Sequence, residues 1–209
     1  MEDKDPTYRR QFLASTFKAG ALLALGWTVL PKRALSYGEK MKLPDTAAFK
    51  DDGIIPNSRY PLLLYRGVVK LGRSDPAAQI EDQFAANNWT NSWRNGIYPF
   101  HHFHSTSHEV LGIYRGSATV RLGGEQGRDF AVQAGDVIVI PAGVGHKNLG
   151  ASDDFGVVGA YPEGRQWDLL TGKPGERPKA DQNIAELPIP GNDPVYGSNG
   201  PLRKIWQGQ

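Results

Sequence analysis

The 209-residue chain contains no cysteine, and this absence removes several kinds of site at once. Without thiols there is no disulfide, no cysteine nucleophile, no Cys-ligated zinc and no iron–sulfur cluster. Any metal would have to be held by nitrogen and oxygen atoms. The chain also lacks an apolar run of the roughly 20 residues that a membrane span needs. Residues 37–209 carry 18 basic and 19 acidic side chains with no basic block. We therefore expect no stable membrane span and no nucleic-acid partner.

Glycine and proline, by contrast, are abundant, with 25 and 15 residues, while 39% of the chain is hydrophobic. This composition can bury a core but is rich in turns, which favours many short strands. Between positions 96 and 161, β-rich runs recur about every ten residues and are separated by Gly or Ser clusters. The runs are Ile97–His104, Glu109–Tyr114, Ala118–Leu122, Asp129–Val132, Val137–Ile140 and Phe155–Tyr161. Their spacing predicts an all-β sandwich or barrel. An earlier strand is expected within Pro61–Leu71, and a short helix over Pro76–Asn88.

Residues 1–36 have the three parts of an export signal. The pair Arg9-Arg10 is followed by an uncharged run from Ala19 to Pro31, which is too short for a membrane span. The arrangement resembles the twin-arginine signal, which a receptor reads as an address. We therefore predict export by the twin-arginine route to a periplasmic or other extracytoplasmic space. The alternative is an amphipathic helix that packs on the domain or lies on a membrane.

The remaining residues, 37–209, are expected to form a single domain. Its barrel core would cover about residues 60–162, with an extended arm before it and a C-terminal arm over residues 163–209. The C-terminal arm is rich in proline and glycine but contains Trp167 and Trp206, which a disordered tail would not need. We expect the arm to dock on the barrel or on a second subunit. Because the two tryptophans have little room in a small barrel core, a homodimer with the arm in its interface is predicted.

Four of the five histidines lie within eight residues: His101, His102, His104 and His108. Alternate residues of a strand face the same side, so His102 and His104 would project together. Glu109 follows a Ser-Thr-Ser turn and can begin the antiparallel neighbour strand, and His146 follows a Pro-Ala-Gly turn. Three imidazoles and one carboxylate can thus converge inside a small barrel. This donor set suits divalent manganese, iron, nickel, copper or zinc. The order of affinities would choose copper or zinc for any such site, so it does not identify the metal.

The spacing of these residues resembles the two motifs of the cupin superfamily. The first motif is matched by His102-Phe103-His104 and Glu109, which are separated by four intervening residues. Gly96 precedes His102 by five intervening residues, and Gly116 follows Glu109 by six intervening residues. The second motif is matched by Pro141-Ala142-Gly143, which follows Gly135 by five intervening residues and precedes His146 by two. This match has one exception, since Gly150 stands where Asn is usual.

The chain further resembles the YjlB-like group of bacterial cupins over nearly all of residues 50–206. Stretches that carry this likeness are Trp93–His101, His104–Glu109 and Asp154–Pro162. The resemblance implies a double-sheet jelly roll, also called a double-stranded β-helix, with extended N- and C-terminal arms. It also implies a metal inside the barrel, held by His102, His104, Glu109 and His146.

Other residues near the motifs are less certain to take part in the site. His101 and His108 project away from the pair, so we expect structural roles or hydrogen bonds to ligands. Tyr98 and Phe100 share the inward face and are expected in the core, with Tyr98 the better candidate to contact a bound molecule. Arg94 could hold an anionic substrate or be a solvated turn residue.

Two functions remain open. The first is a metalloenzyme that oxidises, decarboxylates or isomerises a small organic molecule at the three-histidine, one-glutamate site. The second is a non-catalytic module that binds a metal or a metabolite. Open coordination positions favour the enzyme, whereas the lack of an obvious acid–base residue beside the metal keeps the second function open.

Overall fold

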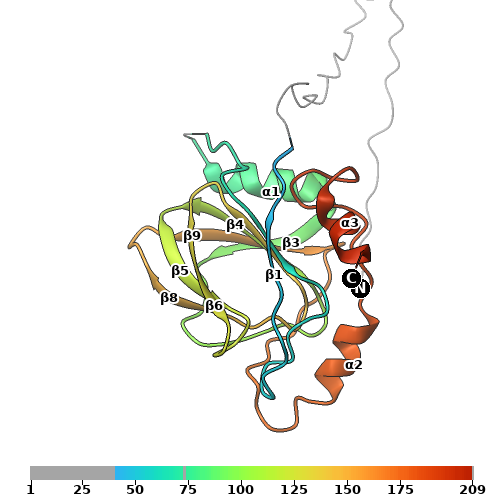
Figure 1. Ribbon diagram of the computed structural model, residues 1–209. Coiled ribbons are helices and arrows are strands. Elements are labelled where there is room, and N and C mark those ends of the chain that lie inside the picture. Colours follow the sequence, from blue (N-terminus) through green and yellow to red (C-terminus); the bar gives the residue numbers. More distant parts are fainter. Residues whose placement is uncertain (1–40, 73, 209) are drawn as a thin grey trace, which may run out of the picture. The chain divides into compact units, whose positions relative to one another are not determined.

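The computed structural model describes residues 41–72 and 74–208. The predicted export signal lies outside these ranges. Among the described residues, nine strands form two antiparallel sheets, in the orders β1-β2-β7-β4-β9-β3 and β6-β5-β8 (Figure 1). The strands are β1 (Asp45–Ala47), β2 (Leu62–Tyr65), β3 (Trp89–Asn95), β4 (Glu109–Arg115), β5 (Ser117–Leu122), β6 (Arg128–Gln133), β7 (Val137–Ile140), β8 (His146–Ala151) and β9 (Gly156–Pro162). The predicted all-β jelly roll with extended arms is confirmed.

The larger sheet is buried on both faces, because alternate residues of its strands enter two different apolar clusters. On β4, Leu111 and Ile113 pack with Val120 and Leu122 of the smaller sheet. Val110 points to the opposite side, into a cluster with residues of α1 (Pro76–Ala86) and α3 (Pro201–Gln207). Strands buried on both faces show continuous apolar runs instead of alternation, and β7 has the sequence Val-Ile-Val-Ile with all four residues buried.

Helix α1 confirms the helix expected over Pro76–Asn88. The Asp75 side chain accepts a hydrogen bond from the Ala78 amide at 3.0 Å, and Pro76 occupies the first turn, where its missing N–H costs nothing. The helix packs on β4 at Gly112, where a Cβ would lie 2.6 Å from Cγ2 of Ile80. This close approach requires glycine at position 112.

One expected strand does not form. Residues Ile97–His104 form no regular strand, since only His102 and Phe103 make isolated bridges. Pro99 lacks the amide N–H that a ladder would need there. Strand β3 forms just before this segment and was not predicted. Its residues are mostly polar, and its pairing has a register shift between Thr90 and Trp93, so its sequence shows no regular alternation.

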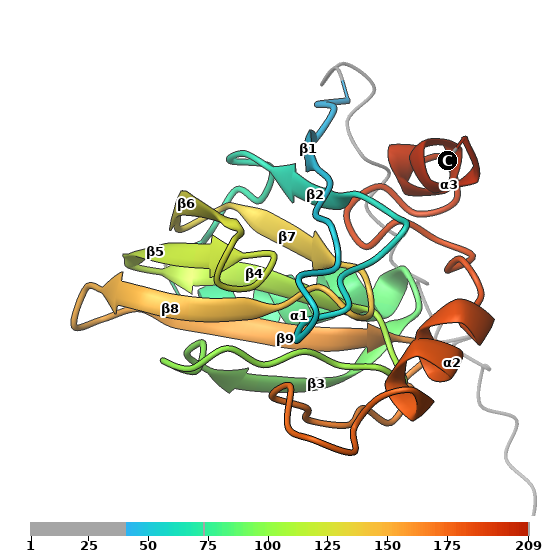
Figure 2. The same ribbon diagram turned by 60° about the horizontal axis from the view of Figure 1, so that its bottom comes forward.

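The C-terminal arm follows β9 and contains α2 (Lys179–Glu186) and α3, which lie outside the strands in Figures 1 and 2. Trp206 is 1% exposed, donates its indole N–H to the Pro61 carbonyl at 2.9 Å, and stacks on Tyr60. Its own chain therefore covers Trp206, which agrees with the alternative in which the arm docks on the barrel. The homodimer itself stays a prediction.

The buried carboxylate of Asp193 fastens the same arm. It accepts hydrogen bonds from the Tyr65 hydroxyl and from the amides of Val195 and Leu202. Because these partners come from the barrel and from the arm itself, the arm is held at a fixed place on the larger sheet. Within the described ranges, no helix is long and apolar enough to cross a membrane.

Candidate metal centre

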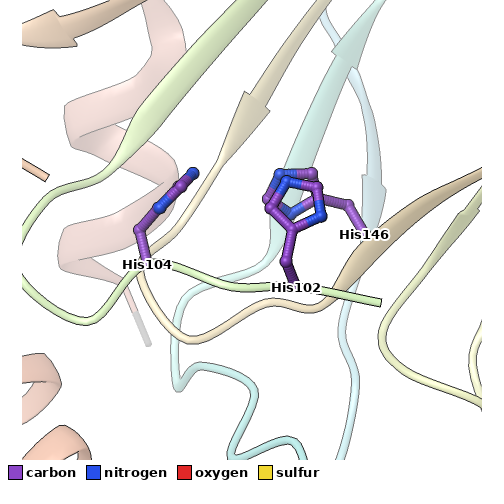
Figure 3. Close-up of side chains that lie close together, drawn as sticks. All are labelled: His102, His104 and His146. Atoms are coloured by element: carbon purple, nitrogen blue, oxygen red, sulfur yellow. The ribbon is translucent and has the colours of Figure 1, made fainter. Parts of the chain in front are cut away.

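Three histidine side chains lie close together (Figure 3). One ligand atom each of His102, His104 and His146 lies within 4.8 Å of the others, and all three residues are buried. Backbone hydrogen bonds join His102 and His146 in both directions, at 3.2 and 2.9 Å. These bonds place the segment before β4 beside the first residue of β8.

The turn before His146 depends on Gly143. This residue has φ +90°, and its amide donates to the His104 carbonyl at 2.8 Å. A Cβ at position 143 would lie 2.2 Å from the carbonyl oxygen of Asn57. The glycine therefore lets two chain segments approach closely enough to join the third histidine to the other two.

Backbone carbonyls hold the Nδ1 atoms of all three histidines. His102 Nδ1 lies 3.2 Å from the Phe100 oxygen and His146 Nδ1 lies 3.2 Å from the Val144 oxygen, while His104 Nδ1 contacts the Asp168 oxygen. Because a carbonyl can only accept, each Nδ1 must carry the proton. In the neutral rings, Nε2 then keeps its lone pair for a ligand.

Glu109 completes the cluster. Its Oε1 accepts a hydrogen bond from the Tyr161 hydroxyl at 3.0 Å, and the hydroxyl oxygen in turn accepts from the Trp93 indole at 2.8 Å. Its Oε2 is buried without a hydrogen-bond partner, at 3.2 Å from His146 Nε2 and 3.5 Å from His104 Nε2.

These four side chains pass a physical test for a metal site. A carboxylate oxygen and imidazole lone pairs that face one another in a buried place repel unless a proton or a metal cation lies among them. Nitrogen and oxygen donors of this kind fit a divalent transition metal.

Burial and charge set the protonation of the cluster. Burial, together with the nearby His146, lowers the pKa of His102 to about 3, so its ring is neutral at pH 7. Burial alone would raise the pKa of the Glu109 carboxyl, but the His104 and His146 rings bring it below its usual range. Burial likewise opposes a charge on His104, yet the Glu109 carboxylate raises the pKa of His104. The cluster therefore favours one positive charge beside Glu109, which a metal ion would supply in place of a proton.

The C-terminal arm supports the site through Asp168, which the motif search did not find. Its carboxylate accepts from the Ser105 amide at 2.6 Å, the Ser105 hydroxyl at 2.5 Å and the Thr106 amide at 3.2 Å. The backbone carbonyl of Asp168 contacts Nδ1 of His104. A β-bridge between Phe103 and Leu170 joins the same two segments. Sequence separation conceals this contact, since His104 and Asp168 are 64 positions apart in the chain.

The two remaining histidines lie away from the cluster. His101 Nε2 lies 2.8 Å from Oε2 of Glu125. The buried His108 accepts from the Ala142 amide at 2.9 Å and reaches the Pro188 carbonyl at 3.3 Å. His108 thus ties the turn before His146 to the C-terminal arm.

The structure places three other candidate residues differently from the sequence-based expectation. They are Arg94, Tyr98 and Phe100. Both carboxylate oxygens of Glu81 hold the Arg94 guanidinium, at 2.6 and 2.9 Å, and Asp75 lies at 3.4 Å. Arg94 lies on β3, not in a turn. Tyr98 and Phe100 are 45% and 43% exposed, so the expectation that they belong to the core is wrong. Their segment passes beside β8, where the Asn148 amide donates to the Tyr98 carbonyl at 2.9 Å, without forming a regular strand.

A cavity of about 200 Å³ opens onto the cluster. His102, His104, Glu109 and His146 all contribute to its lining. Its other walls are mainly apolar or aromatic, formed by Trp93, Ile97, Tyr98, Leu111, Tyr161 and Trp167. A mostly apolar pocket with a few convergent polar groups is typical of a small-molecule site.

Comparisons with known proteins agree with this architecture. Residues 85–161 match the Cupin family. The uncharacterized protein YjlB of Bacillus subtilis strain 168 is 44% identical over 162 residues, which cover 77% of this chain and 95% of that protein.

Similarity to solved structures is more distant. A mutant of Bacillus subtilis oxalate decarboxylase is 19% identical with a TM-score of 0.33, covering 61% of this chain and 30% of that one. Procruciferin, an 11S globulin from Brassica napus, is 20% identical with a TM-score of 0.32, covering 38% of this chain and 21% of that one. The matched part is thus less than a third of either structure.

Proposed function

The chain belongs to the cupin family, within the group of YjlB, and on this premise we propose that it binds a divalent transition metal and acts as a metalloenzyme. The ligands are His102, His104, Glu109 and His146. The substrate is a small organic molecule that enters the cavity beside them, and the reaction is an oxidation, decarboxylation or isomerisation.

The observation that carries this proposal is the unpartnered Oε2 of Glu109. A buried carboxylate oxygen without a hydrogen bond is costly, and most buried polar groups have a partner. Here the oxygen faces Nε2 of His104 and of His146, while the other atom of each side chain is already bonded elsewhere. A divalent cation, in place of a proton on one of the rings, would satisfy these acceptors together.

The chain's own residues would prepare the site for chemistry. A bound divalent ion supplies Lewis-acid polarisation of an oxygen donor on the substrate. Tyr161 and Trp93 keep Glu109 in one orientation through the hydroxyl and the indole N–H. Leu111 and Ile97 line the cavity and are buried, so they exclude water from one side of the ligands.

Metal content tests the proposal directly. Full-length protein, purified without chelators, should contain about one equivalent of a transition metal by elemental analysis. His146→Ala and Glu109→Gln should lose most of it, because each removes one ligand bond and the second also removes the balancing charge. His101→Ala is the matched control, since His101 lies on the same segment but bonds Glu125. Full metal content in His146→Ala would refute the three-histidine site.

One feature favours the second candidate, a non-catalytic module that binds a metal or a metabolite. Apart from the ligand set, the titratable side chains that line the cavity are Arg94, Tyr98 and Tyr161. Two of these three are held by Glu81 and Glu109. Metal-loaded protein should therefore be screened for oxygen uptake and for product formation with small acids and sugars. Tight metabolite binding without turnover would favour the module.

Export by the twin-arginine route is part of the same proposal. It is supported by Arg9-Arg10 and the short uncharged run that follows. Since that route moves folded proteins, the metal would be loaded before export.

A further inference from the structure

Exposed aromatic side chains lie in the wall of the cavity and beside it. Tyr98, Phe100 and Trp167 are 45%, 43% and 38% exposed. Within residues 41–72 and 74–208, all other Phe, Tyr and Trp side chains are buried or half-buried. Contiguous exposed apolar groups mark binding sites more often than scattered ones do. Tyr98 and Trp167 line the cavity and Phe100 stacks on Tyr98, so these rings indicate a ligand that contacts an aromatic surface.

The aromatic rings form two stacked pairs beside the proposed metal ligands. Tyr98 and Phe100 stack with ring centroids 5.0 Å apart and planes at 18°, and Tyr161 and Trp167 stack at 5.7 Å and 23°. The Tyr98 ring stands edge-on to His102 at 5.1 Å. The Trp167 ring stands edge-on to His104 at 5.2 Å. Each of these two histidines thus has an aromatic surface next to it.

The charge of the cavity wall argues against a substrate with several carboxylates. Of the described residues that line the cavity, Arg94 is the cation other than histidine, and Glu81 and Asp75 already hold its guanidinium. A multiply charged anion would lose water on entry and find no second cation in this wall. A flat ring with one set of oxygen donors would instead match both the aromatic pairs and a single metal.

We infer, on the premise of the proposed metal site, that the substrate is a small aromatic compound with neighbouring oxygen donors, and that Trp167 selects its ring. The donors reach the cluster of His102, His104, Glu109 and His146. The ring contacts the faces or edges of Trp167 and Tyr98, the geometries that aromatic pairs prefer. The C-terminal arm thereby contributes a specificity-determining residue to a site built by the barrel.

Two probes with the same donors test the inference. Salicylate carries a carboxylate and a hydroxyl on adjacent carbons of a flat ring, and cis-2-hydroxycyclohexanecarboxylate carries them on a saturated ring. Calorimetric titration of the metal-loaded full chain should show about tenfold tighter binding of salicylate, from aromatic contacts that the saturated ring cannot make. Trp167→Leu should abolish most of this difference. Leu169→Ala is the matched control, because Leu169 is 40% exposed on the same arm but does not line the cavity.

Elemental analysis of the same samples separates the two hypotheses. Equal affinity for both probes on metal-loaded protein, or no salicylate binding at all, would overturn the aromatic substrate and leave the metal site standing. A preference that survives Trp167→Leu would overturn the role of Trp167. Protein that cannot be loaded with metal but still prefers salicylate, and loses this preference in Trp167→Leu, would overturn the metal site while supporting the aromatic pocket.

Discussion

Replacing Asp168 by Asn should weaken the metal site although it removes none of the four proposed ligands. The Asp168 carboxylate holds Ser105 and Thr106, the two residues that follow His104, and its carbonyl holds Nδ1 of His104 itself. The side chain therefore fixes both the segment that carries His104 and the carbonyl that orients its ring. Loosening this contact should let the ring turn away from the cluster.

The size of the effect follows from the individual hydrogen bonds. In the Asp168→Asn variant, the amide oxygen of the new side chain can keep the bonds that Oδ1 accepts from the Ser105 and Thr106 amides. The amide nitrogen then replaces Oδ2, which accepts from the Ser105 hydroxyl at 2.5 Å, and Asn183 already donates to that hydroxyl. One charge-assisted hydrogen bond is lost at a half-buried position, so the free energy of unfolding should fall by about 1–2 kcal/mol. Loss of support for a ligand typically lowers metal affinity by about 10- to 100-fold.

Both quantities can be measured on the same protein. Chelator competition gives the metal affinity, and urea unfolding of the metal-free protein gives the stability. Asp153→Asn makes the same chemical change at an exposed turn between β8 and β9 and should alter neither quantity. A loss of stability with unchanged metal affinity would show that Asp168 supports the fold but not His104. If neither quantity changes, the reasoning from these hydrogen bonds is wrong.

Further predictions concern the core, the support of Glu109, export and assembly. Trp206→Ala should lower the free energy of unfolding by about 3–5 kcal/mol in urea, since it empties a buried tryptophan site; a loss below about 1 kcal/mol would contradict the packing of the arm. Gly159→Ala would place a Cβ 2.2 Å from the Trp93 ring, and the displaced indole should reduce metal content without removing a ligand; unchanged metal would show that Trp93 is not needed to position Glu109. Replacing Arg9-Arg10 by Lys-Lys should retain the chain in the cytoplasm, and fractionation that shows unchanged export would contradict the twin-arginine assignment. Light scattering should show a homodimer, and a monomer would refute that prediction.

Local periodicity in the sequence predicted that His102 and His104 project together, and the resemblance to the two cupin motifs added Glu109 and His146 to them. His102 and His104 are two residues apart, Glu109 begins the next strand after a tight turn, and His146 follows a turn that needs Gly143. These relations depend on short-range backbone geometry, so they survive even though Ile97–His104 is not a regular strand. The same short-range rules predicted the helix at Pro76 and most strands of the two sheets.

What surrounds the ligands was decided only by tertiary structure. Asp168 and Trp167 reach His104 from an arm whose sequence shows neither strand nor helix periodicity at that point, and Tyr161 reaches Glu109 across 52 residues. Such contacts depend on where separate elements dock, and the residues themselves carry no local pattern that specifies a partner. The burial of a side chain is also decided by how separate elements dock. Tyr98 and Trp206 illustrate this, because both are aromatic residues beside Gly- or Pro-containing stretches and yet differ in exposure. Tyr98 is exposed although its carbonyl accepts a hydrogen bond from Asn148 of β8, and Trp206 is buried because α3 packs over Tyr60.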